Sequence, residues 1–252
     1  MTSEKYDGNT ELFSFHGRVL LGTSLLKTQL LHAEAGLITV QSQRDQEGKE
    51  GGTRDMVKIW PYPTKIININ PDEFHSSPRA IAKTEAHPVS EFNGNVKPVR
   101  FLVLALISDM KHDEIEYLSK RIVKSDPPLF EVPQVVHVDE NRLLAVFISA
   151  RGAMNYAELI NKSTKPEAMR LSLHAGPITI DHHNGIQIVT GSTMKEVNAI
   201  SDNALTGLIY ASEQAAAILL LDRQDLLFHP VGRIDFGQEW KEMEVYTVDL
   251  LE

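Results

Sequence analysis

The chain has 252 residues, 42% of them hydrophobic and 23% charged, which suits one large or two small globular domains with their own core. The absence of cysteine excludes disulfides, thiolate nucleophiles and cysteine-ligated zinc. A net charge of −9 argues against nucleic acid as a partner. No apolar run reaches the roughly 18 residues that a membrane-spanning helix needs. Residues 1–15 lack the plan of a signal peptide, so we expect a cytoplasmic protein.

Residues 1–90 are predicted to form a small, mostly β N-terminal module that ends in a connecting linker. Several runs alternate between apolar and polar residues, which is typical of strands. These runs are 13–21 (loosely), 36–40, 56–60 and 65–70. A polar, glycine-rich tip at 43–55 predicts a hairpin with a long loop between the second and third runs. A short helix at 25–34 stays open as an alternative.

Residues 75–97 have the composition of a linker, with an ordered strap as the alternative, and a second domain spans 98–252. We expect this second domain to fold alone. Its first elements are predicted from a continuous apolar run, a helical period and a pair of alternating runs around a polar turn. They are a strand at 101–107, a helix at 113–123, hairpin strands at 134–138 and 143–148, and a helix at 150–160.

The stretch Met169–Ser212 organises this second domain and reads as strand, tight turn, strand, helix and strand. Asn184 and Gly185 form a strong hairpin turn signal, and the neighbouring histidines suit a solvated tip better than a metal site. The closing elements are a helix at 214–221 and strands at 226–236 and 243–248. The predicted class is α+β, with a β-α-β-β-α-β ferredoxin-like core and C-terminal α/β additions.

Three motifs in this order resemble the class III adenylate/guanylate cyclase catalytic domain. His174-Ala175-Gly176-Pro177 is similar to the H-x-G-P at the end of a central strand of that family. Gly191 resembles the glycine that opens the family's catalytic helix, and Gly207–Glu213 (GLIYASE) resembles its p-G-e-i-l-v-S-e. The resemblance covers roughly Pro98 to Leu250 and implies a nucleotidyl cyclase-type core.

In that family two aspartates hold two divalent metal ions on the triphosphate. The resemblance places Leu106 at the first aspartate and Asn141 at the second. A leucine and a neutral amide cannot replace the anionic oxygens that magnesium prefers. A relocated metal site stays open as an alternative, and the carboxylates close enough in sequence are Asp109, Asp139 and Glu140.

The second half of the family's site is altered as well. Without gaps, Lys195 and Ala199 fall at the transition-state asparagine and arginine. A gapped alignment keeps Asn198 but puts Asp202 at the arginine. The two base-reading positions fall at Ile188 and Gly237, and neither side chain can read a purine edge.

The resemblance therefore implies cyclase architecture, while the residues argue against cyclase catalysis. The predicted function is a catalytically inactive, regulatory or scaffolding protein that acts through protein contacts, without a cofactor or metal. One alternative is a sensor that binds a nucleotide or other small ligand in the former cleft without turnover, and another is a divergent nucleotidyl cyclase.

Family members form dimers through the face that carries their sites, so we expect that face to contact a second copy of this chain or another protein. The predicted contact or ligand residues are Leu106, Ile188, Lys195 and His174. The competing prediction is a monomer whose own loops close the cleft. His174 at a strand end is expected to be satisfied by backbone groups.

Overall fold

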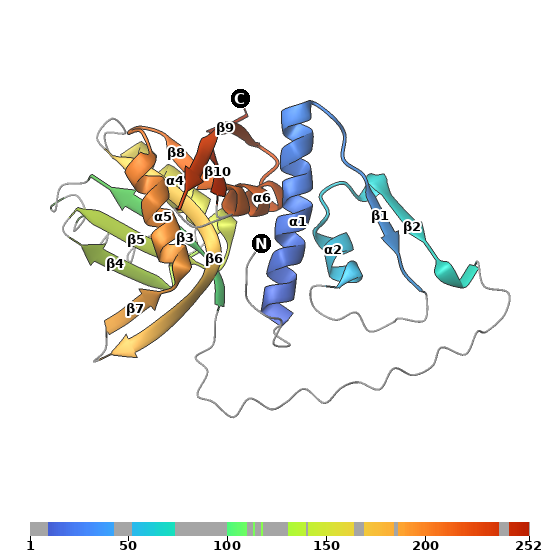
Figure 1. The fold of residues 1–252 in the computed structure, drawn as a ribbon, viewed down its shortest axis with the longest axis horizontal. Helices are drawn as coiled ribbons and strands as arrows, with labels where there is room; N and C mark the ends of the chain where they lie inside the picture. The colour runs from blue at the N-terminus through green and yellow to red at the C-terminus, as the bar shows by residue number, and fades with distance from the viewer. Residues whose placement is uncertain are drawn as a thin grey trace.

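The computed structural model describes residues 10–42, 52–73, 100–109, 113, 117, 131–139, 141–163, 169–183, 186–236 and 242–251. These residues form an eight-stranded mixed sheet with helices on both faces, a long N-terminal helix, and a separate two-stranded sheet (Figure 1). None of the described helices is long and apolar enough to cross a membrane.

The centre of the large sheet is the predicted ferredoxin-like core. Its order is β4-β5-β3-β6, and each neighbouring pair is antiparallel. This places the first strand of the core between the third and the fourth, as in a split β-α-β unit. The elements are β3 (Arg100–Ser108), β4 (Val135–Asp139), β5 (Arg142–Phe147), α4 (Ala150–Ser163) and β6 (Arg170–His183). The predicted helix at 113–123 lies outside the described residues, apart from Asp113 and Tyr117, which are both helical.

The C-terminal additions extend the same sheet. β8 joins β6 in parallel, β10 and β9 continue antiparallel, and β7 pairs with the far half of β6. The elements are β7 (Ile186–Thr190), α5 (Ser192–Asn203), β8 (Ile209–Ser212), α6 (Glu213–Asp222), β9 (Leu226–Asp235) and β10 (Glu242–Leu250). Both the α+β class and the predicted additions are confirmed.

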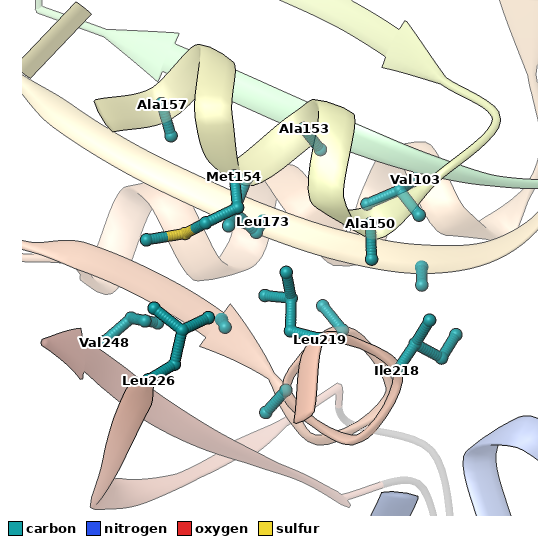
Figure 2. Close-up of a cluster of buried hydrophobic side chains, with 14 of the residues drawn as sticks. Val103, Ala150, Ala153, Met154, Ala157, Leu173, Ile218, Leu219, Leu226 and Val248 are labelled. Atoms are coloured by element: carbon teal, nitrogen blue, oxygen red, sulfur yellow. The ribbon is translucent and has the colours of Figure 1, made fainter. Parts of the chain in front are cut away.

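The alternation of side chains along β3 divides the core into two layers. Val103, Ala105 and Ile107 face a large apolar cluster shared with α4 and α6, part of which Figure 2 shows. Leu102, Leu104 and Leu106 face a second cluster, which includes Val197 of α5. Since β3 is apolar on both faces, its continuous hydrophobic run in the sequence follows directly from this burial.

The prediction of a mostly β N-terminal module is wrong, because Thr10–Leu31 forms α1. Apolar residues recur at helical spacing along it, and the loose two-residue alternation is a by-product of that period. The residues with this spacing are Leu12, Phe15, Val19, Gly22 and Leu26. The open alternative of a helix at 25–34 covers only the end of this helix.

The rest of this segment also departs from the predicted hairpin. The expected strand at 56–60 is the helix α2 (Thr53–Ile59), while the other two expected strands are β1 (Leu37–Val40) and β2 (Ile66–Ile69). β1 and β2 are parallel, so they need a crossover between them, and α2 lies in that connection. Short 3₁₀ turns flank β2 at Pro63–Lys65 and Pro71–Glu73.

α1 packs along α6 and shares the large apolar cluster of the sheet (Figure 1). Gly22 allows this approach, since a Cβ atom there would lie 1.9 Å from the carbonyl oxygen of Ala217. The expected boundary between residues 90 and 98 lies outside the described residues and stays a prediction. The second domain was expected to have a core of its own, but the large apolar cluster of the sheet includes side chains of α1.

Candidate functional site

The H-x-G-P motif lies on β6, and its histidine is part of a buried polar network. The imidazole of His174 contacts the Ser212 hydroxyl through Nδ1 at 2.8 Å and the Glu196 carboxylate through Nε2 at 2.7 Å. The prediction that backbone groups satisfy His174 is therefore wrong, because its partners are two side chains from α5 and the start of α6.

The chain Ser212–His174–Glu196 has the residue types of a nucleophilic triad, but its geometry serves structure. Ser212 Oγ accepts the backbone N–H of Ala215 at 3.1 Å, so it caps the N-terminus of α6. Ser212 is fully buried, and both ring nitrogens of His174 are already engaged. A substrate has no open position beside the hydroxyl, so this network ties α5 and α6 to β6.

Two glycines, Gly176 of the H-x-G-P motif and Gly191 before the helix, allow the first turn of α5 to lie close to β6. A Cβ atom on Gly176 would lie 2.7 Å from Thr193 Oγ1, and that hydroxyl donates to the Pro177 carbonyl at 2.6 Å. Gly191 precedes α5 with φ of +136°, a backbone conformation that other residues rarely adopt. These two glycines therefore allow α5 to begin in close contact with β6.

Two arginines hold the other end of α5 over the strand ends of the core. Arg142, at the start of β5, donates to Asn198 Oδ1 at 2.7 Å and to Asp202 Oδ1 at 3.0 Å. Arg170 pairs with Asp109 at 2.8 Å and also donates to the carbonyl oxygens of Ser201 and Asp202, at 3.3 Å each. We call these six residues the α5 clamp.

A buried pair of hydroxyls lies under this clamp. Ser108 Oγ and Ser201 Oγ are 2.7 Å apart, and both residues are buried. One of these hydroxyls donates to the other, so this contact between the end of β3 and α5 gives each buried oxygen a partner.

Leu106, at the first metal position of the family, is only 3% exposed and belongs to the apolar cluster beneath α5. Its partners across the sheet are Leu144 of β5 and Ser172 of β6. The position therefore lies in core, where an ionised carboxylate would have no charged partner. Leu106 cannot be a contact residue of the intact fold, and burial excludes His174 from that role as well.

The other expected residues lie on or near the surface. Ile188 on β7 is 42% exposed, Lys195 on α5 is exposed, and Ala199 is half-buried on the same helix. Asn141, at the second metal position, is exposed in the turn before β5. Gly237 lies outside the described residues.

The described carboxylates do not support the alternative of a relocated metal site. Asp109 is paired with Arg170, Asp139 is exposed at the end of β4, and Glu140 lies outside the described residues. Across the described ranges, no three His, Asp or Glu side chains come together in a way that could hold a metal ion.

A second charged cluster lies on β10, away from α5. The Tyr246 hydroxyl donates to Glu244 at 2.6 Å, and Arg233 and Lys27 approach the same carboxylate at 3.0 and 3.3 Å. The Tyr246 hydrogen bond is the main cause that lowers the pKa of Glu244 to about 2, followed by those of the two cations. Burial and the neighbouring carboxylate raise the pKa of Tyr246. Lys27 comes from α1, so this cluster also ties α1 to the sheet.

A cavity of about 360 Å³ lies between α1, the first residues of β3 and the start of α4. Phe15 and Phe101, with ring centroids 4.7 Å apart, form part of its wall together with Arg18 and Arg100. None of the cyclase-family positions named above lines it. It is therefore a different place from the former cleft in which a nucleotide was expected as an alternative.

Several of the residues that determine this site are not apparent in the sequence. Arg142 and Arg170 lack a motif, and their partners are 31 to 61 residues away (Arg142 to Asp202 is 60, Arg170 to Asp109 is 61). Glu196 lies in the helix predicted after Gly191, but nothing in the sequence indicates that its carboxylate contacts His174.

Comparisons with known proteins give fold-level likenesses only. No protein-family model matches the chain and no curated protein matches it. Among solved structures, a guanylate cyclase domain from Catenaria anguillulae is 16% identical, with a TM-score of 0.46 over 61% of this chain and 98% of that one. An adenylyl cyclase from P. aeruginosa is 11% identical, with a TM-score of 0.46 over 60% and 96%.

An adenylate/guanylate cyclase/hydrolase from Silicibacter pomeroyi is 16% identical, with a TM-score of 0.47 over 60% of this chain and 97% of that one. At these identities and scores the matches describe similarity and carry nothing about activity. The strand order β4-β5-β3-β6 with its additions is the cyclase-like feature that this chain itself presents.

Proposed function

We propose that this protein is a catalytically inactive, cyclase-like regulatory or scaffolding protein that acts through protein contacts. The observation that carries the proposal is the burial of Leu106 in an apolar cluster, at the position where the family resemblance requires a metal-binding carboxylate. Two-metal catalysis needs anionic oxygens on both ions, and neither Leu106 nor Asn141 supplies one.

The α5 clamp supports the same conclusion. Arg142 follows the second metal position directly and carries its positive charge to Asn198 and Asp202. In the gapped alignment Asp202 takes the place of the catalytic arginine, so a carboxylate that binds an arginine stands where the family has a guanidinium. The side chains of the clamp thus hold α5 in place, and both of its arginines are engaged with partners.

The contact surface that we propose is the outer side of α5 and β7. It contains the exposed Lys195 and Ile188, whereas Leu106 and His174 lie beneath it. We propose a protein partner here because an exposed aliphatic side chain on β7 and an exposed lysine on α5 favour a mixed apolar and polar interface.

Two measurements test this proposal. The melting temperature of the intact protein should not change with ATP or GTP in the presence of Mn²⁺, since a ligand that binds only the native state must stabilise it. A clear increase would favour the ligand-sensing alternative. Protein partners captured by the parent chain should be lost with Ile188→Glu and retained with Val231→Glu, a matched change of an exposed strand residue on β9.

A further inference from the structure

The two-stranded sheet has one covered face and one uncovered face. Leu37 and Ile66 pack against the large apolar cluster, and in the next pair along this face Thr39 donates to Asn68 Oδ1 at 3.3 Å. The opposite face consists of four β-branched aliphatic residues, which we call the β1–β2 face. They are Ile38 (64% exposed), Val40 (62%), Ile67 (61%) and Ile69 (36%).

The register places these four side chains together. Ile38 pairs with Ile67 and Val40 pairs with Ile69, so each pair lies side by side on one face of the parallel ladder. The pair of strands lies on the far side of α1 from the large sheet (Figure 1). Parallel strands occur almost only in sheets that are covered on both faces, so this parallel pair lacks a neighbour on its open face among the residues that the structure describes.

We infer that the β1–β2 face is a self-association surface that packs against the same face of a second copy of this chain. Three properties favour a second copy over a different partner: charge, twist and area.

The net charge of −9 makes two copies of the chain repel each other unless they meet where charges are absent. The eight residues of β1 and β2, Leu-Ile-Thr-Val and Ile-Ile-Asn-Ile, include no charged side chain. Their open face has neither a hydrogen-bonding nor an ionic group with which to select a partner of different chemistry.

The twist of β1 and β2 also favours a second copy. Two sheets pack face to face most readily when their strands are nearly aligned and their twists agree. A second copy of the chain has the same strand twist because it has the same structure. In a twofold dimer, each copy contributes the same four side chains to the contact.

The area of the β1–β2 face is on the order of 400 Å², comparable with the largest apolar patch of an ordinary monomer. A standard interface buries about 800 Å² on each partner, so this face supplies about half of it. The expected association is therefore weak and reversible, with its apolar centre on these four side chains and a polar rim around them.

Sedimentation of the full chain between micromolar and high micromolar concentration tests the inference. The parent chain should show a monomer–dimer equilibrium, and Ile67→Glu or Ile38→Glu should weaken association at least about 100-fold, because each would bury a charge without a partner. Val231→Glu, an exposed aliphatic strand position outside the face, should leave association unchanged. At a concentration at which the parent is monomeric, the melting temperatures of all three variants should equal that of the parent, because the replaced side chains are exposed.

A mixing experiment identifies the occupant as a second copy. Chains carrying Ile67→Glu and chains carrying Ile67→Lys should each be monomeric alone and should associate when mixed at equal concentration. A parent chain that stays monomeric over the whole range overturns the inference, and so does a dimer that persists in both Ile38→Glu and Ile67→Glu.

Unfolding of the Ile67→Glu monomer would also overturn the inference, because it would mean that the chain itself covers this face. Loss of self-association in Ile188→Glu but not in Ile67→Glu would move the dimer contact to α5 and β7. The inference uses no residue of that surface, so its failure and the failure of the proposed function are distinguishable.

Discussion

The close approach of α1 to α6 at Gly22 predicts that Gly22→Ala destabilises the protein. The new Cβ atom would lie 1.9 Å from the Ala217 oxygen and 2.3 Å from its carbonyl carbon. An ordinary contact begins near 3.4 Å, so the helices must separate by about 1.5 Å (3.4 minus 1.9). The seven residues from Ala215 to Leu221 are all buried, so α6 cannot move away alone.

The magnitude follows from two opposing terms. Alanine is a better helix former than glycine, which favours the variant by about 1 kcal/mol. Overpacking typically costs 1–3 kcal/mol, and a shift of 1.5 Å lies at or above the upper end, because even a gap of 0.5–1 Å forfeits a quarter to a half of a dispersion contact. Since the buried Phe15, Leu25 and Leu26 move with the helix, we expect a net loss of about 2 kcal/mol or more.

Urea unfolding at pH 7 measures this loss, with Ser24→Ala as the control. Ser24 is exposed on the same helix, so alanine there should be neutral or slightly stabilising. Adding Ala217→Gly to Gly22→Ala should not restore stability, because the clash is with backbone atoms of Ala217. A Gly22→Ala protein as stable as the parent would refute the packing of α1 against α6.

Three further predictions concern the interior. Leu106→Asp should lower the free energy of unfolding by at least about 3 kcal/mol, because it buries an unpaired charge, whereas Leu106→Met should cost less than about 1.5 kcal/mol; chemical denaturation measures both. Glu244 has a folded pKa of about 2 against an ordinary 4.5, so its stabilisation is present above pH 4.5 and lost as the pH falls towards 2. Glu244→Gln should flatten the stability curve in that window and cost about 1–2 kcal/mol at pH 7, which pH-dependent thermal melts can follow. Gly176→Ala should destabilise by about 1–3 kcal/mol and be largely rescued by Thr193→Ala, since the clash is with the Thr193 hydroxyl; a double-mutant cycle tests the coupling.

The second domain could be predicted from the sequence because its signals are local. The apolar run of β3, the turn after His183 and the helical period after Gly191 each identify an element by short-range chemistry. The order of these elements then leaves few possible topologies. For this reason the ferredoxin-like core and its additions agree with the structure.

The N-terminal segment could not be read in the same way, because its periods are ambiguous over short runs. Residues 56–60 alternate like a strand, yet they complete a crossover helix between two parallel strands. α1 is recognisable only when Gly22 is counted as a core position, and that depends on the partner helix α6.

The sequence predicted the site residues whose positions can be counted from the family motifs. It did not predict contacts between side chains that are far apart in the sequence. Leu106 and Asn141 are found by counting from motifs. The burial of Leu106, the side-chain partners of His174 and the α5 clamp follow only from how β6, α5 and α6 pack. Only the structure shows that, of the residues predicted for the contact face, Ile188 is exposed and Leu106 is buried.

The absence of cyclase turnover is the central claim, and a cyclic nucleotide assay tests it most directly. The intact protein, incubated with ATP or GTP and with Mg²⁺ or Mn²⁺, should form no cyclic AMP or cyclic GMP above a protein-free control. Leu106→Asp combined with Asn141→Asp should also remain inactive, because Ala199 and Ile188 leave the transition state and the base without partners. Turnover by the parent chain that disappears in Asp109→Asn or Asp139→Asn would contradict the claim and identify a relocated metal site.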